Sequence, residues 1–139
     1  MKKTLLTFLV ASITLNSCTC NQTNSYNLET DLIGQWDILL ANGQSTSGAD
    51  SQPFINFTDS GMVHGNASIN HFFGQYTLKG DSIFFDQIGM TSMMGHRMEI
   101  ESAVTTALNK CATLEILDST LYAKDMQGNI VLAMEKSKQ

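Results

Sequence analysis

The sequence predicts a mainly β (α+β) domain: a small antiparallel β-barrel-like fold of about eight strands with one α-helix packed on it. Short runs of alternating apolar residues are separated by glycine- and aspartate-rich turns at hairpin spacing. Only one segment has a helical period, and strands and helices do not alternate as they do in parallel-sheet proteins. With 42% hydrophobic and 15% charged residues in 139, the chain has a globular composition.

The first 17 residues have the pattern of a lipoprotein signal peptide. Two lysines are followed by an apolar run, residues 5–15, which is too short to span a bilayer as a mature helix, and the run leads to Leu-Asn-Ser-Cys at Cys18. The pattern predicts cleavage before Cys18 and acylation of that cysteine, by palmitate among other chains, which would attach the protein to a membrane of the cell envelope, the outer membrane by preference. Secretion with a different cut is the alternative, since Asn16 is less usual there than a small residue.

Residues 18–33 are mostly polar and have no period, so they are interpreted as a tether that holds a domain at 34–136 off the membrane. The formal charge of the chain is −5, and removal of 1–17 takes two lysines and no acid, which makes the mature chain −7. This charge argues against a nucleic-acid partner. Cys111 is interpreted as a small buried apolar residue, while a disulfide with Cys20 remains possible.

The strands are predicted from alternating apolar residues, and the turns from Gly, Asp, Asn and Ser between them. The strand markers are Trp36, Ile38 and Leu40, then Ile55 and Phe57, then Ile83 and Phe85, then Leu114 and Ile116; the turns are 59–61, 80–81, 118–119 and 127–129. Residues 41–52 are rich in Gly and Ser and are predicted to form a flexible loop.

The single predicted helix lies within residues 99–111. Its apolar residues follow the spacing i, i+3, i+4, i+7, i+8, i+11, which places them on one face; they are Ile100, Ala103, Val104, Ala107, Leu108 and Cys111. Glu99 and Glu101 in the first turn and Lys110 in the last match the helix dipole. Glu101 is either a solvated acid or a partner for backbone amides, and the sequence leaves that open.

Three short motifs resemble the META domain of the HslJ-like heat-shock proteins and of many bacterial envelope lipoproteins. They are GNASINHFFGQY at 65–76, TSMMG at 91–95, and Glu101 in the helix, and the resemblance extends over residues 34–135. It implies an envelope role connected with stress and drug tolerance, without an established reaction. It also implies a family-motif site made of Gly65, Asn70, Gly74, Tyr76, Thr91, Met93 and Glu101.

Each motif residue has a physical role that can be stated in advance. Gly65 and Gly74 suit positive φ or a close backbone approach, and Asn70 is expected to hydrogen-bond backbone groups of its loop. Tyr76 needs a partner for its hydroxyl. The resemblance places Met93 in the core. Family members often carry cysteine where this chain has Ile69 and Gly95, so no thiol role carries over and packing alone must hold this site.

The motifs that would indicate an enzyme are missing from the sequence: G-x-S-x-G, H-E-x-x-H, a P-loop and C-x-x-C. The sequence therefore favours a non-enzymatic binding module without a cofactor, whose partner is an unknown protein or a small apolar ligand. Periplasmic Cu(I) binding is the alternative, because thioethers and an imidazole cluster within residues 90–98, namely Met90, Met93, Met94, His96 and Met98. Core packing of these methionines is the competing interpretation.

The segments 65–76 and 91–98 are expected to meet in space, with Asn70 and Thr91 within one or two side-chain lengths. Both interrupt strand patterns with glycine and an amide or hydroxyl residue, and loops of this kind on a rigid barrel often carry binding function. Their large apolar residues either form an exposed surface or turn inward and close the end of the barrel. These residues are Phe72, Phe73, Met93 and Met94.

Overall fold

The computed structural model describes residues 26–138. The predicted signal peptide at 1–17 and the acylation site at Cys18 lie outside the described residues, as does Cys20. Neither described helix is long and apolar enough to cross a membrane.

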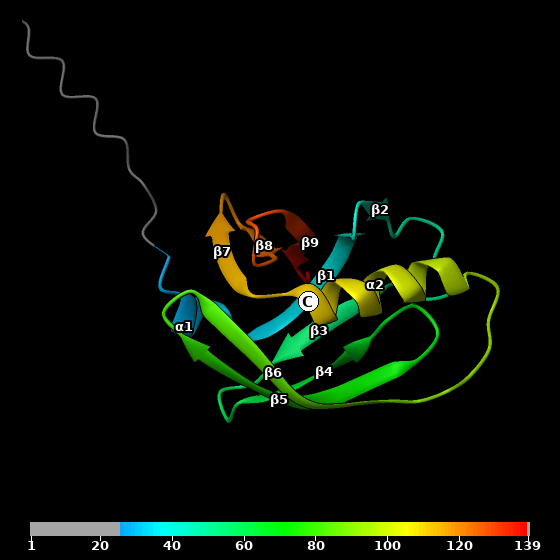
Figure 1. The fold of residues 1–139 in the computed structure, drawn as a ribbon, viewed down its shortest axis with the longest axis horizontal. Helices are drawn as coiled ribbons and strands as arrows, with labels where there is room; N and C mark the ends of the chain where they lie inside the picture. Colours follow the sequence, from blue (N-terminus) through cyan, green and yellow to red (C-terminus); the bar gives the residue numbers. More distant parts are fainter. Residues whose placement is uncertain (1–25, 139) are drawn as a thin grey trace, which may run out of the picture.

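The described chain contains nine strands and two helices (Figure 1). In chain order they are α1 (Leu28–Asp31), β1 (Gly34–Ala41), β2 (Gln44–Ser45), β3 (Phe54–Phe57), β4 (Met62–Asn66), β5 (His71–Lys79), β6 (Ser82–Met90), α2 (Met98–Lys110), β7 (Thr113–Leu117), β8 (Thr120–Lys124) and β9 (Ile130–Lys136).

Eight of the strands form a closed antiparallel barrel, which confirms the predicted fold class. The order is β1-β3-β4-β5-β6-β7-β8-β9, and β9 pairs back onto β1. The ninth strand, β2, is a two-residue extension that pairs only with β1. Closure removes exposed sheet edges wherever the ladders are complete.

The predicted turns are confirmed where glycine or a short polar residue adopts positive φ. Gly61, Gly80 and Gly128 have φ of 78°, 63° and 85°, and Asp118 and Ser119 have φ of 48° and 68°. Only glycine, or a short polar residue such as Asp or Asn, adopts this conformation at low cost.

Two local predictions are wrong. In β1 the alternation breaks at a β-bulge between Ile38 and Leu40, so Ala41 faces the core and Leu40 does not. A bulge adds one residue and reverses the faces beyond it. The segment 41–52, expected to be flexible, contains β2 and is pinned at Thr46, whose buried hydroxyl donates to Ile38 O at 2.6 Å.

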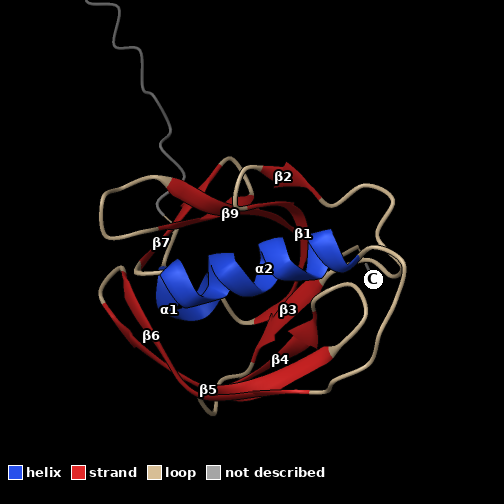
Figure 2. Cartoon of the chain, turned by 45° about the vertical axis from the view of Figure 1, so that its right-hand side comes forward, coloured by secondary structure: helices blue, strands red, loops and turns tan. Residues whose placement is uncertain are grey.

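Helix α2 runs across the opening of the barrel and buries its predicted apolar stripe (Figure 2). Val104 and Ala107 are fully buried, and they join a core formed by inward-facing residues of the strands. Cys111, directly after α2, forms no disulfide within residues 26–138, and it is packed against this core without being fully buried. The helix contacts β1 and β9, so it covers that side of the barrel more closely than the β5–β6 side.

The segment 26–33, assigned to the tether from its polarity, is part of the folded domain. Leu32 is buried, and its carbonyl accepts a 2.8 Å hydrogen bond from the indole of Trp36. Lys136 Nζ donates to Asp31 O at 2.9 Å and lies 4.6 Å from the centre of the Trp36 ring. Partners from β1 and β9 therefore anchor this short helix, and local polarity could not reveal them.

Candidate functional site

Three connections meet at the first turn of α2, at one end of the barrel. They are residues 67–70 between β4 and β5, residues 91–97 between β6 and α2, and residues 46–53 between β2 and β3. Figure 1 shows the 91–97 loop at the end of the domain opposite α1. Because none of these connections is a regular element, side chains supply many of their hydrogen bonds.

The buried amide of Asn70 joins two of these connections. Its Oδ1 accepts from Met93 N at 2.6 Å and from Thr91 Oγ1 at 2.9 Å, and its Nδ2 donates to Met93 O at 2.9 Å and to Glu101 Oε1 at 2.8 Å. All four hydrogen-bonding positions of the amide are thus in use. The expected meeting of segments 65–76 and 91–98 is confirmed, with Asn70 and Thr91 in direct contact.

Glu101 binds the same network from the first turn of α2. Its Oε2 accepts from Asn70 N at 2.7 Å and from Ile69 N at 3.3 Å, in addition to the Asn70 Nδ2 bond. The residue is buried, and within the described chain no lysine or arginine pairs with it. N–H donors and the positive end of the helix dipole stabilise the carboxylate instead. Of the two roles left open for Glu101, the structure shows the second.

The 67–70 connection is strained, and its neighbours hold it in place. Ser68 has φ of 117°, a region that non-glycine residues rarely adopt. Its N–H donates to Asn66 Oδ1 at 2.7 Å, and its carbonyl accepts from Ser51 N at 3.0 Å. Its hydroxyl accepts from Asp50 N at 3.2 Å. Residues of the 46–53 connection therefore support the backbone that carries Asn70.

Sequence reasoning missed Asp50, which fixes the end of the 91–97 loop. Its Oδ2 accepts from His96 N at 3.0 Å and from Arg97 N at 2.9 Å, directly before α2. Arg97 Nη1 also donates to Gly48 O at 3.3 Å. An acidic residue among serines and glycines carries turn chemistry in its sequence, but nothing in that pattern identifies a partner 46 residues away.

Ile69 and Gly95 pack directly on each other. A Cβ atom placed on Gly95 would lie 2.5 Å from both Cγ1 and Cδ1 of Ile69. Since Cγ1 is one bond, about 1.5 Å, from the Ile69 Cβ, the two Cβ positions lie within about 4 Å of each other. Packing of isoleucine over glycine thus joins the loops here. The expectation that packing alone holds the site is wrong, because the hydrogen bonds of Asn70 and Glu101 join the same segments.

The two motif glycines are required for close approach. A Cβ on Gly65 would lie 2.1 Å from Phe54 O and 2.5 Å from the ring of Phe72, which covers this glycine from the neighbouring strand. Gly74 is crossed by Ile88, whose Cδ1 would lie 2.6 Å from a Cβ. A side chain at position 65 would displace Phe72 or the backbone of β3, and one at position 74 would displace Ile88 or the backbone of β6.

The proposed family-motif set does not form a single site. Asn70, Thr91, Met93 and Glu101 form the network at the first turn of α2. Gly65 lies in β4 beneath Phe72, Gly74 lies further along β5, and Tyr76 donates to Thr58 O at 2.7 Å in the β3–β4 turn. The sequence grouped them because they are close along the chain, whereas β5 carries them away from the loops at about 3.4 Å per residue.

The comparisons identify the family. The model described as META domain matches residues 27–138. The chain belongs to the META-domain family. The matched region includes α1, in agreement with the packing of that helix on β1 and β9. No match was found among curated proteins.

Solved structures share the fold of this META domain at low sequence identity. A DUF4847 family protein from Bacteroides vulgatus has a TM-score of 0.58 and 13% identity, covering 81% of this chain and 98% of the other. A protein from Burkholderia xenovorans, solved by NMR, has a TM-score of 0.58 and 18% identity, covering 100% of both chains. Another NMR structure has a TM-score of 0.59 and 19% identity, covering 73% and 87%. At these identities the likeness shows the fold alone.

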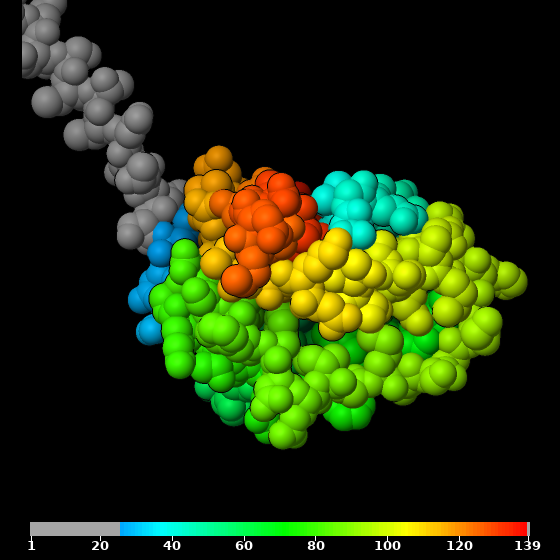
Figure 3. Space-filling view, viewed as in Figure 1, coloured from blue at the N-terminus to red at the C-terminus, as the bar shows by residue number. Residues whose placement is uncertain are grey.

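The large apolar residues of the META-domain motifs divide between the core and the surface. Phe72 is buried, whereas Phe73 is exposed. Met93 is 53% exposed and Met94 is 87% exposed, so the expectation that Met93 packs into the core is wrong. Its backbone N–H and carbonyl bind Asn70, and this leaves the side chain directed outward. In Figure 3 the yellow-green atoms of this loop form the end of the domain.

The candidate Cu(I) ligands of the META domain lie in different surroundings. Met90 lines a groove between β6 and α2, and Met98 begins α2 and is partly buried. Met93, Met94 and His96 are exposed on the 91–97 loop. Among the described residues, no group of three His, Cys, Asp or Glu side chains is arranged to hold a metal.

The META-domain network can fix a loop, and its polar groups are committed to that task. No buried side-chain nitrogen or oxygen atom in the described residues lacks a hydrogen-bond partner. The carboxylate of Glu101 accepts three hydrogen bonds and the amide of Asn70 makes four, all within the protein. The accessible part of the site is consequently the outer surface of the 91–97 loop.

Proposed function

We propose that this META-domain protein is a lipid-anchored, non-enzymatic binding protein of the cell envelope, which presents its 91–97 loop to a protein partner. The observation that carries the proposal is an irregular loop whose backbone is held in its middle and at its end before α2. The holding bonds come from Asn70 to Met93 and from Asp50 to His96 and Arg97.

A loop held in this way is suited to binding. Association loses less free energy when a loop is already ordered, because fewer conformations are given up. The two large apolar side chains that it exposes, Met93 and Met94, are flexible and polarizable, and methionines of this kind adapt to varied partner surfaces. Binding residues are commonly placed on loops that a rigid scaffold supports.

The position of the loop relative to the predicted anchor supports the same function. Acylation at Cys18 would leave eight residues before Tyr26, and eight residues span at most about 29 Å. The domain would then stay close to the bilayer with α1 nearest to it. The 91–97 loop lies at the opposite end (Figure 1), so it would face the envelope space where a partner can approach.

The anchor is tested by replacing Cys18 with alanine in the full chain. The variant should move from the membrane fraction to the soluble fraction, because it has no thiol to acylate, whereas replacement of Cys20 should leave the fractionation unchanged. If the Cys18→Ala protein remains in the membrane fraction, the lipid anchor at this residue is refuted.

The binding surface is tested with a photo-crosslinking residue at one of two methionines. Met94 and Met126 are 87% and 86% exposed, but Met126 lies in the β8–β9 connection. They therefore present equal opportunity for chance contact. In intact envelopes, the residue at position 94 should crosslink to a defined partner, and the residue at position 126 should not.

A second substitution separates specific contact from proximity. Met93→Glu should abolish the crosslink from position 94, because it places a charge in the proposed apolar contact, and it should leave thermal stability unchanged since the side chain is exposed. Met62→Glu, on the exposed face of β4, is the matched control. Equal crosslinking from positions 94 and 126, or crosslinking that survives Met93→Glu, would refute the loop as the binding surface.

A further inference from the structure

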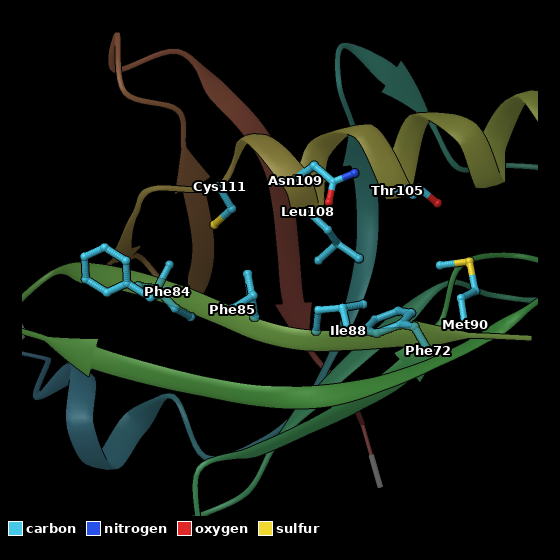
Figure 4. A pocket seen from close by; sticks show the side chains of 10 residues that line it. Phe72, Phe84, Phe85, Ile88, Met90, Thr105, Leu108, Asn109 and Cys111 are labelled. Carbon is cyan, nitrogen blue, oxygen red and sulfur yellow. The ribbon is translucent and has the colours of Figure 1, made fainter.

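A groove separates α2 from β6 on one side of the barrel (Figure 4). It exists because β6 pairs with β7 at a single position, Ser82↔Thr113. Extending that antiparallel register would place Cys111 opposite Phe84 and the end of α2 opposite the rest of β6. The segment that would pair with the rest of β6 is therefore the end of α2, which is helical and cannot form a strand ladder. As a result, β6 keeps an unpaired edge beside the groove.

The groove is large enough for a small molecule. Its volume is about 460 Å³, within the range of roughly 300–1,000 Å³ typical of ligand pockets, and an apolar cavity of about 150 Å³ already holds benzene. Phe72, Phe85, Ile88 and Met90 form the sheet side, and Leu108 lies opposite on α2 (Figure 4). Ile88 is 40% exposed although it points into the barrel, so this apolar surface is accessible from solvent.

Two polar side chains of α2 border the groove, Thr105 and Asn109. The Thr105 hydroxyl donates to Glu101 O at 2.8 Å, and its oxygen retains the capacity to accept. The Asn109 amide has no hydrogen-bond partner among the described residues, so it can both donate and accept. The groove therefore combines an apolar floor with hydrogen-bonding groups along one wall.

No residue that lines the groove carries a formal charge at neutral pH. Cys111 is the only ionisable residue in the lining, and burial raises the pKa of its thiol to about 12, so that it stays protonated. The whole chain is acidic, with a net charge of −5. Charge complementarity thus favours an uncharged ligand over an anion, which would lose its hydration without gaining a cation.

We propose that the α2–β6 groove binds an uncharged amphiphilic small molecule, with its apolar body against Phe85, Ile88 and Leu108 and a hydrogen-bonding group on Asn109. The ligand would cover the inward-facing apolar surface that α2 leaves open. This site is separate from the 91–97 loop, and it does not depend on the function proposed for that loop.

Fluorescence of N-phenyl-1-naphthylamine tests the proposal, because this neutral probe emits strongly only in apolar surroundings. The mature chain, from residue 18 onward with Cys18→Ala, is used, since it has neither acyl chains nor the apolar run 5–15, which would itself bind the probe. We expect saturable binding of one probe per chain. Decanol should displace the probe, and decanoate at pH 8 should require at least about tenfold higher concentration, because the two compounds share a chain length and differ in charge.

Matched variants locate the site. Ile88→Glu places a charge in the groove and should weaken probe binding by at least about tenfold. Ile130→Glu should have no effect, since Ile130 is similarly exposed, at 47%, but lies at the start of β9 and does not line the groove. Asn109→Ala should weaken competition by decanol by about three- to tenfold, which corresponds to one lost hydrogen bond.

Circular dichroism confirms that each variant is folded before binding is measured. The proposal is overturned if the probe does not bind, if Ile88→Glu and Ile130→Glu bind it equally, or if decanoate competes as well as decanol. Binding that is lost in Ile88→Glu alone, together with preference for decanol, supports it.

Discussion

Replacing Glu101 with glutamine tests whether the buried carboxylate holds the 91–97 loop to α2. The substitution keeps the size of the side chain and exchanges one acceptor oxygen for an NH₂ group. In the parent, Oε2 accepts from Asn70 N and Ile69 N, and Oε1 accepts from Asn70 Nδ2. In either orientation of the new amide, its NH₂ group faces at least one N–H donor.

The Asn70 amide cannot relieve this clash by turning over. Met93 N donates to Asn70 Oδ1, and Asn70 Nδ2 donates to Met93 O. A reversed amide would place donor against donor and acceptor against acceptor at Met93. The unfavourable contact therefore stays at position 101.

The expected cost follows from the hydrogen bonds that are lost. A bond to a charged acceptor contributes about 1.5–3 kcal/mol, and a buried donor without a partner costs about 1–3 kcal/mol. The two costs describe partly the same loss and are not simply added, so we expect the free energy of unfolding to fall by about 2–4 kcal/mol. For a domain of this size, that corresponds to a decrease in Tm of roughly 10 °C.

Glu99→Gln is the matched control. Glu99 lies in the same turn of α2, but its side chain is exposed, and its one hydrogen-bond and ion-pair partner among the described residues is Arg97. The control should melt within roughly 2 °C of the parent, as surface changes usually do. Thermal unfolding followed by circular dichroism measures both variants. If Glu101→Gln melts together with Glu99→Gln, the network does not support the loop and the reasoning fails.

Four further predictions concern the loops, the thiol and the methionines. The double substitution Ile69→Cys and Gly95→Cys should form a disulfide, because the Cβ positions lie within about 4 Å, and should raise the free energy of unfolding by about 2–4 kcal/mol under oxidising conditions; free thiols after air oxidation would contradict it. In a chain whose other cysteines are alanine, Cys111 should react with iodoacetamide at pH 8 on the order of a thousandfold more slowly than in the unfolded chain, since burial raises its pKa from 9.0 to about 12. The same shift in pKa predicts that the free energy of unfolding keeps its full value below pH 9 and falls as the pH rises toward 12, because only the unfolded thiol then ionises. Equal iodoacetamide rates for the folded and unfolded chains would refute the burial of Cys111. Stoichiometric Cu(I) binding is not expected, because Met90 packs against the core and Met98 is partly buried, whereas Met93, Met94 and His96 are exposed; a one-to-one complex, lost in Met94→Leu with His96→Ala, would establish a copper site.

Local patterns predicted much of the fold, and their failures are informative. The period of the α2 residues identified the buried face from Ile100 to Leu108, because side chains three and four residues apart share one side of a helix. The prediction that Leu40 continues the buried alternation of β1 was wrong, since a bulge depends on the partner strand β9 and not on the composition of β1. Residues 41–52 were predicted to be flexible because the composition of the segment does not show its hydrogen-bond partners Ile38 and Ser68, which lie outside it.

The candidate site was predicted in part. Asn70 and Thr91 were placed together, and they are bonded. Gly74 and Tyr76 were included because they are close in sequence, yet β5 separates them from the loops. Asp50 was missed because an acid in a serine-rich segment has no local feature that distinguishes a loop anchor from a solvated turn.

The sequence by itself determined the kind of most elements, though not of α1 or β2: strands from their period of two, α2 from its period of 3.6, and turns from residues that tolerate positive φ. These properties depend on neighbours along the chain, because sterics and side-chain direction act over a few residues. Only the tertiary structure decided which distant groups meet, such as Asp50 with Arg97 and Asn70 with Glu101. It also decided that α2 replaces a strand beside β6 and leaves a groove. Those outcomes depend on the register in which the barrel closes, and every strand contributes to that register at once.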